Sequence, residues 1–367
     1  MKLTCKKDYL KEAFSTAEKM LGKTLSLPIL SNFLLSTDNG RLKISATDLE
    51  IGLNYWINSK IEKEGAIAVP GKLISSLINN LPDKPISFNS EKNKLIVSCD
   101  KYKTTLQGFD PAEYPIIPKV KSEKTITFDA TELKEAISQV INAASLSDGR
   151  VELNGIFLAM DKNTARVVAT DSFRLAEKKL KPKNVTGLTE TSFIIPLKTA
   201  NELMRMLDVG PTIEMHHTKQ QALFRTENAE LFSRLVEGNF PNYEQIIPRA
   251  YITNTQILRD DLFNALRVAG IFSSRINDVR FDIDPSMKEI FLTSTDQDKG
   301  ENNVGLEART EGKKMTVVFN HRYLLDGLSN IKTEKVILEL SGETSAALLR
   351  PDGDGSYLYL VMPIKNY

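Results

Sequence analysis

One segment of the chain has the residue types of a phosphate-binding loop. Residues 17–24 read Ala-Glu-Lys-Met-Leu-Gly-Lys-Thr, which fits the loose form of that motif with Ala in place of its first Gly. A working loop runs from a buried strand into a helix whose N-terminus binds the phosphates. Here residues 8–21 have helical periodicity and end at Gly22, a normal helix stop, so the order is reversed. Nucleotide hydrolysis therefore remains only an alternative function.

The other reactive side chains do not form a catalytic or metal-binding set. His216 and His217 are adjacent in an alternating strand and point to opposite faces, and the third histidine is His321. Cys5 and Cys99 lie in strand-like segments without a partner at metal-ligand spacing, so we expect buried, reduced thiols. No serine elbow, dinucleotide fingerprint or histidine–glutamate zinc motif occurs. We expect no catalytic residue, no metal and no cofactor.

Charge and hydropathy narrow the class of protein further. The 367 residues contain 48 Lys and Arg against 47 Asp and Glu, so the net charge of +1 gives no global attraction to nucleic acid. Any electrostatic partner must be bound by local patches. No apolar run approaches the ~20 residues that cross a bilayer, and the N-terminal lysines precede no apolar signal segment. We expect a soluble, cytoplasmic protein.

The elements that position these residues occur three times. An apolar helical stripe recurs, and an acidic or hydroxyl residue two places before each stripe is predicted to cap the helix. The three caps are Asp8, Thr131 and Asp260. The stripes are Leu10, Ala13, Phe14 and Ala17; Leu133, Ala136, Ile137 and Val140; and Leu262, Ala265, Leu266 and Ala269.

A predicted hairpin follows each helix and ends in Thr-Asp. The hairpins span residues 34–46, 156–169 and 281–294, and their Thr-Asp pairs are 123 and then 125 residues apart. A strand-to-helix transition comes next in each repeat, with the first helix predicted to bury Leu73 and Leu77. The pattern predicts three tandem α+β domains at residues 1–121, 122–249 and 250–367, with Pro-rich boundary segments at 111–124 and 241–253.

Several short blocks together carry a family resemblance. They are Leu27-Pro28-Ile29-Leu30, Thr47-Asp48-Leu49-Glu50, Leu153-Asn154-Gly155, Val168-Ala169-Thr170-Asp171, residues 202–208, Phe240-Pro241-Asn242-Tyr243 and Val361-Met362-Pro363. In this order, and from Met1 to the end of the chain, they resemble the bacterial replicative sliding clamps, the beta subunit of DNA polymerase III. The resemblance implies three clamp domains with antiparallel sheets outside and helices lining a central hole. It also implies a non-catalytic, homodimeric processivity subunit of the polymerase holoenzyme.

Domain size is consistent with that architecture. A 120-residue domain has a radius of gyration near 14 Å, hence a diameter of roughly 35 Å. Three such spheres in a triangle leave a hole of only about 6 Å, whereas six in a ring leave one of about 35 Å. A duplex roughly 20 Å wide passes only the larger hole. Three repeats are therefore half of a ring, and a head-to-tail homodimer supplies the rest. A closed ring stays on DNA without tight, sequence-specific contacts.

The resemblance also places residues for DNA and for protein partners. The DNA-binding candidates are Lys23, Thr24, Arg150, Lys198, Arg205 and Arg275, each of which is otherwise an ordinary surface residue. Polymerases, the clamp loader and repair factors are expected to dock short apolar peptides in a pocket between the second and third domains. The pocket residues are Leu153, Thr170, Ser172, Phe173, Arg174, Leu175, Pro241, Gln245, Ile246, Ile276, Asn320, Tyr323, Thr344, Ala346, Met362, Pro363, Ile364 and Lys365.

Alternatives stay open for the C-terminus, for four pocket residues and for the dimer contact. The apolar ending 361–364 either packs in the core or lines a groove. Where the family commonly has Gly-His, a basic residue and an aromatic, this chain has Ser172-Phe173, Gln245 and Ile276, so its peptide preference could differ. The dimer contact is expected between Thr104 and Leu106 of one copy and Ile271 and Phe272 of the other, unless the latter two are a buried helix end. A repeat scaffold that binds proteins but not DNA is the third hypothesis.

Overall fold

The computed structural model describes residues 1–22, 27–120, 124–147, 149–187 and 190–365. The chain divides into two compact units. Unit 1 comprises Met1–Thr131, Pro182–Thr189 and Lys198–Leu235, and unit 2 comprises Glu132–Lys181, Glu190–Leu197 and Val236–Tyr367. Each unit therefore holds one terminal repeat and part of the middle repeat. Among the described helices, none has the length and apolar character that a membrane span requires.

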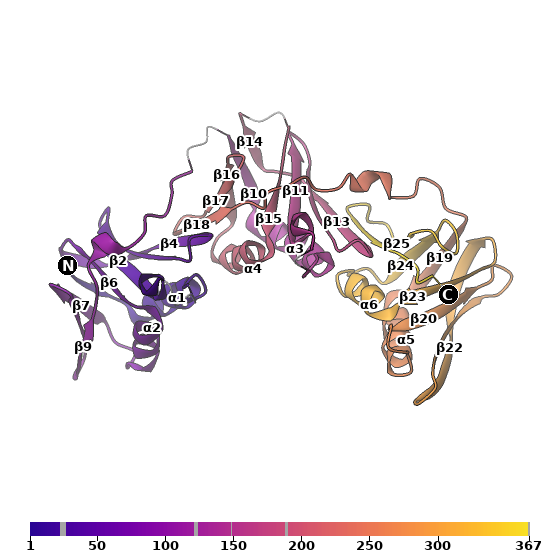
Figure 1. Cartoon of the computed structure of the whole chain (residues 1–367), viewed down its shortest axis with the longest axis horizontal. Helices are drawn as coiled ribbons and strands as arrows, with labels where there is room; N and C mark the ends of the chain where they lie inside the picture. Colours follow the sequence, from indigo (N-terminus) through magenta and orange to yellow (C-terminus); the bar gives the residue numbers. More distant parts are fainter. Residues whose placement is uncertain (23–26, 121–123, 148, 188–189, 366–367) are drawn as a thin grey trace. The chain divides into compact units, whose positions relative to one another are not determined.

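Unit 1 contains two antiparallel sheets. A five-stranded sheet has the order β5-β1-β7-β8-β9, and a nine-stranded sheet has the order β14-β10-β16-β17-β18-β4-β3-β2-β6 (Figure 1). The strands of the first sheet are β1 Lys2–Cys5, β5 Lys60–Lys63, β7 Ile86–Glu91, β8 Lys94–Cys99 and β9 Tyr102–Gln107. Those of the second are β2 Asn32–Asp38, β3 Arg41–Thr47, β4 Ile51–Asn58, β6 Ala66–Pro70, β10 Thr125–Asp129, β14 Asn184–Thr186, β16 Thr212–His217, β17 Gln221–Arg225 and β18 Ala229–Arg234.

Unit 2 is built on one twelve-stranded antiparallel sheet. Its order is β15-β11-β12-β13-β26-β25-β24-β19-β22-β21-β20-β23. Its first six strands in chain order are β11 Gly155–Asp161, β12 Ala165–Thr170, β13 Arg174–Leu180, β15 Glu190–Pro196, β19 Thr253–Leu258 and β20 Asp278–Ile283. The others are β21 Glu289–Asp296, β22 Gly300–Gly312, β23 Met315–Asn320, β24 Lys335–Leu340, β25 Ala347–Pro351 and β26 Tyr357–Val361. The three predicted hairpins are β2–β3, β11–β12 and β20–β21.

The described residues form six α-helices, and each of the three predicted repeats contains two of them. They are α1 Lys7–Glu18, α2 Gly71–Asn80, α3 Ala130–Val140, α4 Leu197–Met206, α5 Arg259–Ile271 and α6 His321–Ser329. In each terminal repeat the two helices pack together, α1 with α2 and α5 with α6 (Figure 1). All three predicted stripes are buried. The prediction for α2 is wrong in phase, because Leu73 is 53% exposed while Ile74 and Ile78 are buried.

The predicted helix caps are also wrong. Asp8 and Asp260 lie inside the first turns of α1 and α5, whose cap positions have no side-chain acceptor. At α3 the Thr131 N–H donates to Asp129 Oδ1 at 2.9 Å. The side-chain acceptor at the start of this helix is therefore Asp129, and the predicted acceptor Thr131 is the donor. The reason is that each strand runs directly into its helix, which leaves the carboxylates to act on the helix dipole instead.

Two strand joints connect neighbouring repeats, one within each unit. The last strand of the middle repeat, β18, pairs with β4 of the first repeat, from Ala229 opposite Tyr55 to Ser233 opposite Ile51. The last strand of the third repeat, β26, pairs in the same way with β13 of the middle repeat. We call these the β4–β18 joint and the β13–β26 joint. The second one positions most of the predicted pocket residues.

Candidate functional site

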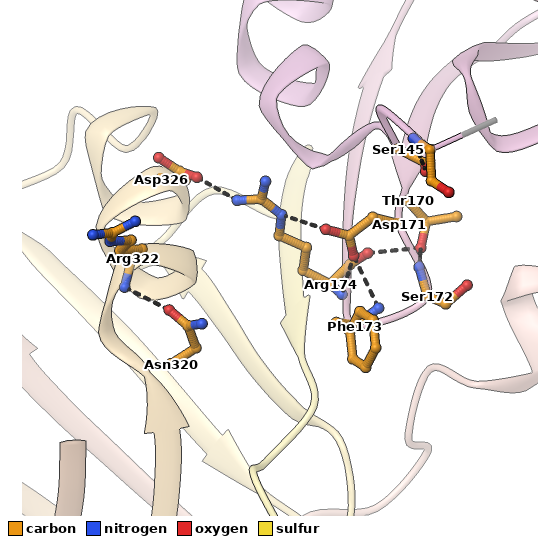
Figure 2. A network of polar contacts seen from close by, with 10 residues as sticks. Ser145, Thr170, Asp171, Ser172, Phe173, Arg174, Asn320, Arg322 and Asp326 are labelled. Carbon is orange, nitrogen blue, oxygen red and sulfur yellow. Dashed lines mark hydrogen bonds and ion pairs between the residues drawn. The ribbon is translucent and has the colours of Figure 1, made fainter. Parts of the chain in front are cut away.

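A Thr-Asp turn lies at the start of β13, beside the β13–β26 joint. Thr170 Oγ1 donates to the Arg174 carbonyl at 2.6 Å, and Asp171 Oδ1 accepts the N–H groups of Phe173 and Arg174 at 2.9 and 3.0 Å (Figure 2). Ser172 has a φ of 79°, in the left-handed region. These bonds fix the turn so that the Phe173 side chain, 61% exposed, points away from the core.

Arg174 is the centre of a charged network on this turn. Its Nε donates to Asp171 Oδ2 at 3.0 Å, its Nη1 pairs with Asp326 of α6, and its guanidinium lies 4.5 Å from the centre of the Tyr323 ring (Figure 2). Burial opposes the charge, but the hydrogen bonds and the charges around it raise the pKa of Arg174. Arg174 therefore stays cationic and joins the turn to α6.

An apolar cluster lies beneath the turn. Its buried members are Val168, Leu175, Tyr243, Ala346, Leu348 and Leu360, and Met362 and Ile247 pack against them. The Tyr243 hydroxyl donates to the buried Glu177 Oε2 at 2.5 Å, and burial together with this carboxylate raises the pKa of Tyr243. This bond ties the linker between repeats to the sheet.

The C-terminal residues 361–364 alternate in burial. Val361 is a buried strand residue, whereas Met362 and Ile364 are half-exposed. The Met362 N–H donates to the Phe173 carbonyl at 2.8 Å, and the Ile364 N–H donates to the Val318 carbonyl at the same distance. The chain end thus closes one side of the surface around the turn.

The predicted pocket residues all lie in unit 2 and differ in burial. Five are buried: Leu153, Thr170, Leu175, Ala346 and Pro363. Six are half-exposed: Arg174, Pro241, Asn320, Tyr323, Met362 and Ile364. Seven are exposed: Ser172, Phe173, Gln245, Ile246, Ile276, Thr344 and Lys365. The turn, α6 and the C-terminus are connected by the contacts given above.

Sequence reasoning missed two carboxylates of this site. Asp326 pairs with Arg174, and Glu177 accepts the hydrogen bond of Tyr243. Asp326 stands three residues after Tyr323 on α6, so the two share a helix face, and that spacing was a usable signal. Glu177 gave no such signal, because an acidic residue followed by two lysines in a strand looks solvent-exposed.

The predicted DNA-binding cations are mostly engaged with carboxylates. Lys23 and Thr24 lie outside the described residues. Lys198 pairs with Asp48, and Arg205 pairs with Glu202 one helical turn earlier. Arg275 is exposed.

Arg150 adjoins the Thr-Asp turn of unit 2. Its Nε pairs with Glu152 Oε1 at 3.0 Å, and its Nη1 donates to Ser172 Oγ at 3.0 Å. This candidate DNA residue therefore contacts a candidate pocket residue.

The expected dimer residues lie at a sheet edge and a helix end. Thr104 and Leu106 belong to β9, the edge strand of the five-stranded sheet. Ile271 ends α5 and is 63% exposed, so the alternative of a buried helix end is wrong for this residue, and Phe272 is half-buried.

The remaining reactive side chains are structural. Cys5 and Cys99 are free and buried as predicted, and burial raises the pKa of Cys5 to about 12. His321 Nδ1 is 2.9 Å from the Asn277 carbonyl, and burial lowers the pKa of His321. In the part of the chain that the structure describes, no three His, Cys, Asp or Glu side chains gather as a metal site.

Three family models cover nearly the whole chain. The N-terminal, central and C-terminal domains of the DNA polymerase III beta subunit match residues 1–118, 127–242 and 244–365. The beta sliding clamp of Synechococcus elongatus is 30% identical over 374 residues, which cover 100% of this chain and 99% of that protein. The beta sliding clamp of Staphylococcus aureus is 27% identical, with 100% of both chains covered.

Solved structures agree with these matches. The DNA polymerase III beta subunit of Thermotoga maritima has a TM-score of 0.92 at 31% identity, and the sliding clamp of Bacillus subtilis has 0.95 at 25%, each covering 100% of both chains. The resemblance and the three-domain fold predicted from the sequence are thereby confirmed. The chain belongs to the DNA polymerase III beta subunit family, the non-catalytic sliding clamps that act as processivity factors in DNA replication.

Proposed function

We propose that two copies of this chain join head to tail into a ring that encircles duplex DNA and tethers the replicative polymerase in the cytoplasm. The observation that carries this proposal is an unfinished pattern of strand joints. The last strands of repeats two and three each pair with the preceding repeat, whereas β9, the last strand of repeat one, is a sheet edge.

The strand that would receive β9 is the first half of β22. Residues 300–307 of β22 pair with β21 as β4 pairs with β3, and residues 308–312 pair with β19 as β5 pairs with β1. β22 thus corresponds to β4 and β5 joined into one strand. By this correspondence, the part equivalent to β4 is open to the β9 strand of a second copy. Unpaired antiparallel edges are ready templates for such pairing.

The two existing joints also define a register for the third. Leu231 is opposite Leu53 and Ser233 is opposite Ile51 in the β4–β18 joint. Counting from the hairpin turns places Thr104 opposite Asn302 of the second copy, and Leu106 opposite Gly300. The exposure of Ile271 at the end of α5, which contacts β21 and β22, supports an apolar contact beside this joint.

The ring interpretation explains why its DNA-facing cations need not be strong binders. Lys198 and Arg205 each have a carboxylate partner, which reduces the number of counterions that contact with phosphates would release. A ring holds DNA by topology, so weak contacts favour sliding. Asp48→Asn is expected to leave Lys198 free for phosphate and to make sliding slower and more salt-dependent.

Partner proteins would dock on the surface around the Thr-Asp turn of unit 2. Phe173, Ile246 and Ile276 are apolar and exposed there, and the Arg174 network holds the turn on α6. We assign this surface to the polymerase, the clamp loader and other proteins that carry short apolar motifs. Phe173→Asp is expected to abolish both loading by the clamp loader and processive synthesis, while the free protein remains a dimer.

The decisive experiment loads the protein onto nicked circular DNA and then linearises the circle. Release only after cutting supports encirclement, and equal retention on circle and line would contradict it. Strand pairing is tested separately with Thr104→Glu combined with either Asn302→Glu or Asn302→Lys. Like charges placed opposite each other weaken the joint and opposite charges restore it. Thr104→Glu with Asn302→Glu should sediment as a monomer, and Thr104→Glu with Asn302→Lys should sediment as a dimer. Met287→Asp, on an exposed turn, is the control and should remain dimeric.

A further inference from the structure

A cavity lies in unit 1, at the β4–β18 joint. Strands β2, β3, β4, β17 and β18 contribute its floor, and residues 115–120 of the linker after repeat one form a wall. Its volume is about 590 Å³, within the range of small-ligand and side-chain pockets. Its floor crosses the joint, so the cavity reaches the place in unit 1 that the apolar cluster fills in unit 2. Unit 2 has a cavity of its own beside that cluster, of about 550 Å³ and lined by Phe157, Arg166 and Tyr243 among others.

Smaller side chains leave this space open. Counted from the two Thr-Asp turns, Gly52 stands where unit 2 has Leu175, and Ser45 stands where it has Val168. Ile117 of the linker packs on Gly52, with its side chain 3.1 Å from where a Cβ atom would lie. This side chain fills only part of the volume that Leu175 occupies in unit 2. The cavity is therefore a consequence of specific residues at equivalent positions.

The cavity has a mixed lining, in which apolar side chains and the ring of Trp56 lie among polar groups. Trp56, the single tryptophan of the chain, is half-exposed, and its Nε1 donates to Asp38 Oδ2 at 2.8 Å. Ile116 on the linker is 92% exposed, while Leu223 and Phe232 are buried in the floor. An isoleucine so exposed beside a tryptophan is unfavourable in water and is stabilised by an apolar side chain placed between them.

The lining of the cavity carries an excess of positive charge. Arg225 pairs with Glu230 at 2.8 Å, and Asp38 keeps its negative charge while it accepts the Trp56 N–H. Lys43 and Lys119 also line the cavity, and within the described ranges neither forms an ion pair. The free charge therefore complements an acidic ligand.

We propose that this cavity binds a short acidic peptide of a partner protein through one bulky apolar side chain. Single-stranded nucleic acid fits less well, because Lys43 and Arg41 lie 5.2 and 5.8 Å from the centre of the Trp56 ring, where a stacked base would compete with them. A peptide side chain enters beside Ile116 without displacing either cation. The site is independent of ring closure and of the surface in unit 2.

The test uses a fluorescein-labelled peptide in which a Leu-Phe pair is flanked on both sides by Asp and Glu. Anisotropy measures its affinity for the full-length protein, and the emission of Trp56 reports where it binds, because no other tryptophan contributes. We expect saturable binding with a matching shift of the tryptophan emission. Absence of binding would overturn the proposal.

Matched variants localise the binding. Ile116→Asp and Lys119→Glu change exposed side chains and are each expected to weaken binding by about tenfold. Lys92→Glu, the same charge change on the β7–β8 turn, should have no effect. Phe173→Asp disables the apolar surface of unit 2 and should leave the shift of the Trp56 emission unchanged. The proposal is wrong if Phe173→Asp abolishes binding while Ile116→Asp does not. It is equally wrong if a single-stranded oligonucleotide shifts the Trp56 emission at lower concentration than the peptide.

Discussion

The Thr-Asp turns of the first and second repeats share a backbone and differ in their side chains. Thr47 Oγ1 donates to the carbonyl four residues later at 2.8 Å, as Thr170 Oγ1 does at 2.6 Å. Asp48 and Asp171 each accept two N–H groups of their own turn, and the third residue of each turn has a φ of 78° or 79°. The repeat therefore preserves a hydrogen-bonded backbone.

The side chains of the two turns make different contacts. Ile51 is buried in unit 1, whereas its counterpart Arg174 reaches α6 and pairs with Asp326. Asp48 instead accepts Lys198 from α4. A stable backbone turn thus allows the two joints to carry different side chains, and so different surfaces, without any change of fold.

The largest expected difference concerns the two charged contacts. Arg174→Met should destabilise unit 2 by about 3 kcal/mol, because the mostly buried Asp171 loses its partner. Lys198→Met should cost less than about 1 kcal/mol, since that lysine is 49% exposed. Urea unfolding followed by circular dichroism measures both. Equal losses would mean that the two joints do not differ in this way.

A second comparison uses the two linker tyrosines. Tyr243 donates to a buried carboxylate, whereas Tyr114 donates to the backbone carbonyls of Asn32 and Ser45 at 3.2 and 3.3 Å. Tyr243→Phe is expected to cost about 2 kcal/mol and Tyr114→Phe about 1 kcal/mol. Thermal unfolding of the two variants tests the order, and a larger loss for Tyr114→Phe would contradict it.

Glycine at the left-handed positions should stabilise both turns. Leu49→Gly and Ser172→Gly remove the steric cost of a positive φ, with a net gain of about 0.5–1 kcal/mol after the added chain entropy. The melting temperature is the measurement. Ser172→Ala, which keeps the Cβ atom, is the control and should give no gain.

The smallest effect is a pH dependence in each unit. Burial lowers the pKa of His217 in unit 1 and of His321 in unit 2 below the ordinary value of about 6.5. As the pH falls below that value, the unfolded chain takes up protons first, so stability decreases until the folded pKa is reached. Above it both states are neutral and the contribution is constant. His217→Gln and His321→Gln should each flatten part of the profile of melting temperature between about pH 7.5 and about pH 5.5.

The local elements followed from the sequence because their signals are periodic. Three hairpins and three of the four predicted helix faces agree with the spacing of apolar residues. The face of α2 was misread, since Leu73 and Ile74 are equally apolar and only packing against the sheet selects Ile74. The helix caps were misread because strand and helix are continuous.

The sequence by itself determined the threefold repeat, the free thiols and the family, since these depend on residue types at fixed separations. Tertiary structure decided which strand of one repeat joins the next, that Arg174 contacts Asp326, and that Gly52 and Ser45 leave a cavity. Those features join residues up to 187 positions apart, as in the pairing of Arg174 with Val361 across the β13–β26 joint. Contacts of this kind depend on volume and hydrogen-bond geometry across strands, which local periodicity does not encode.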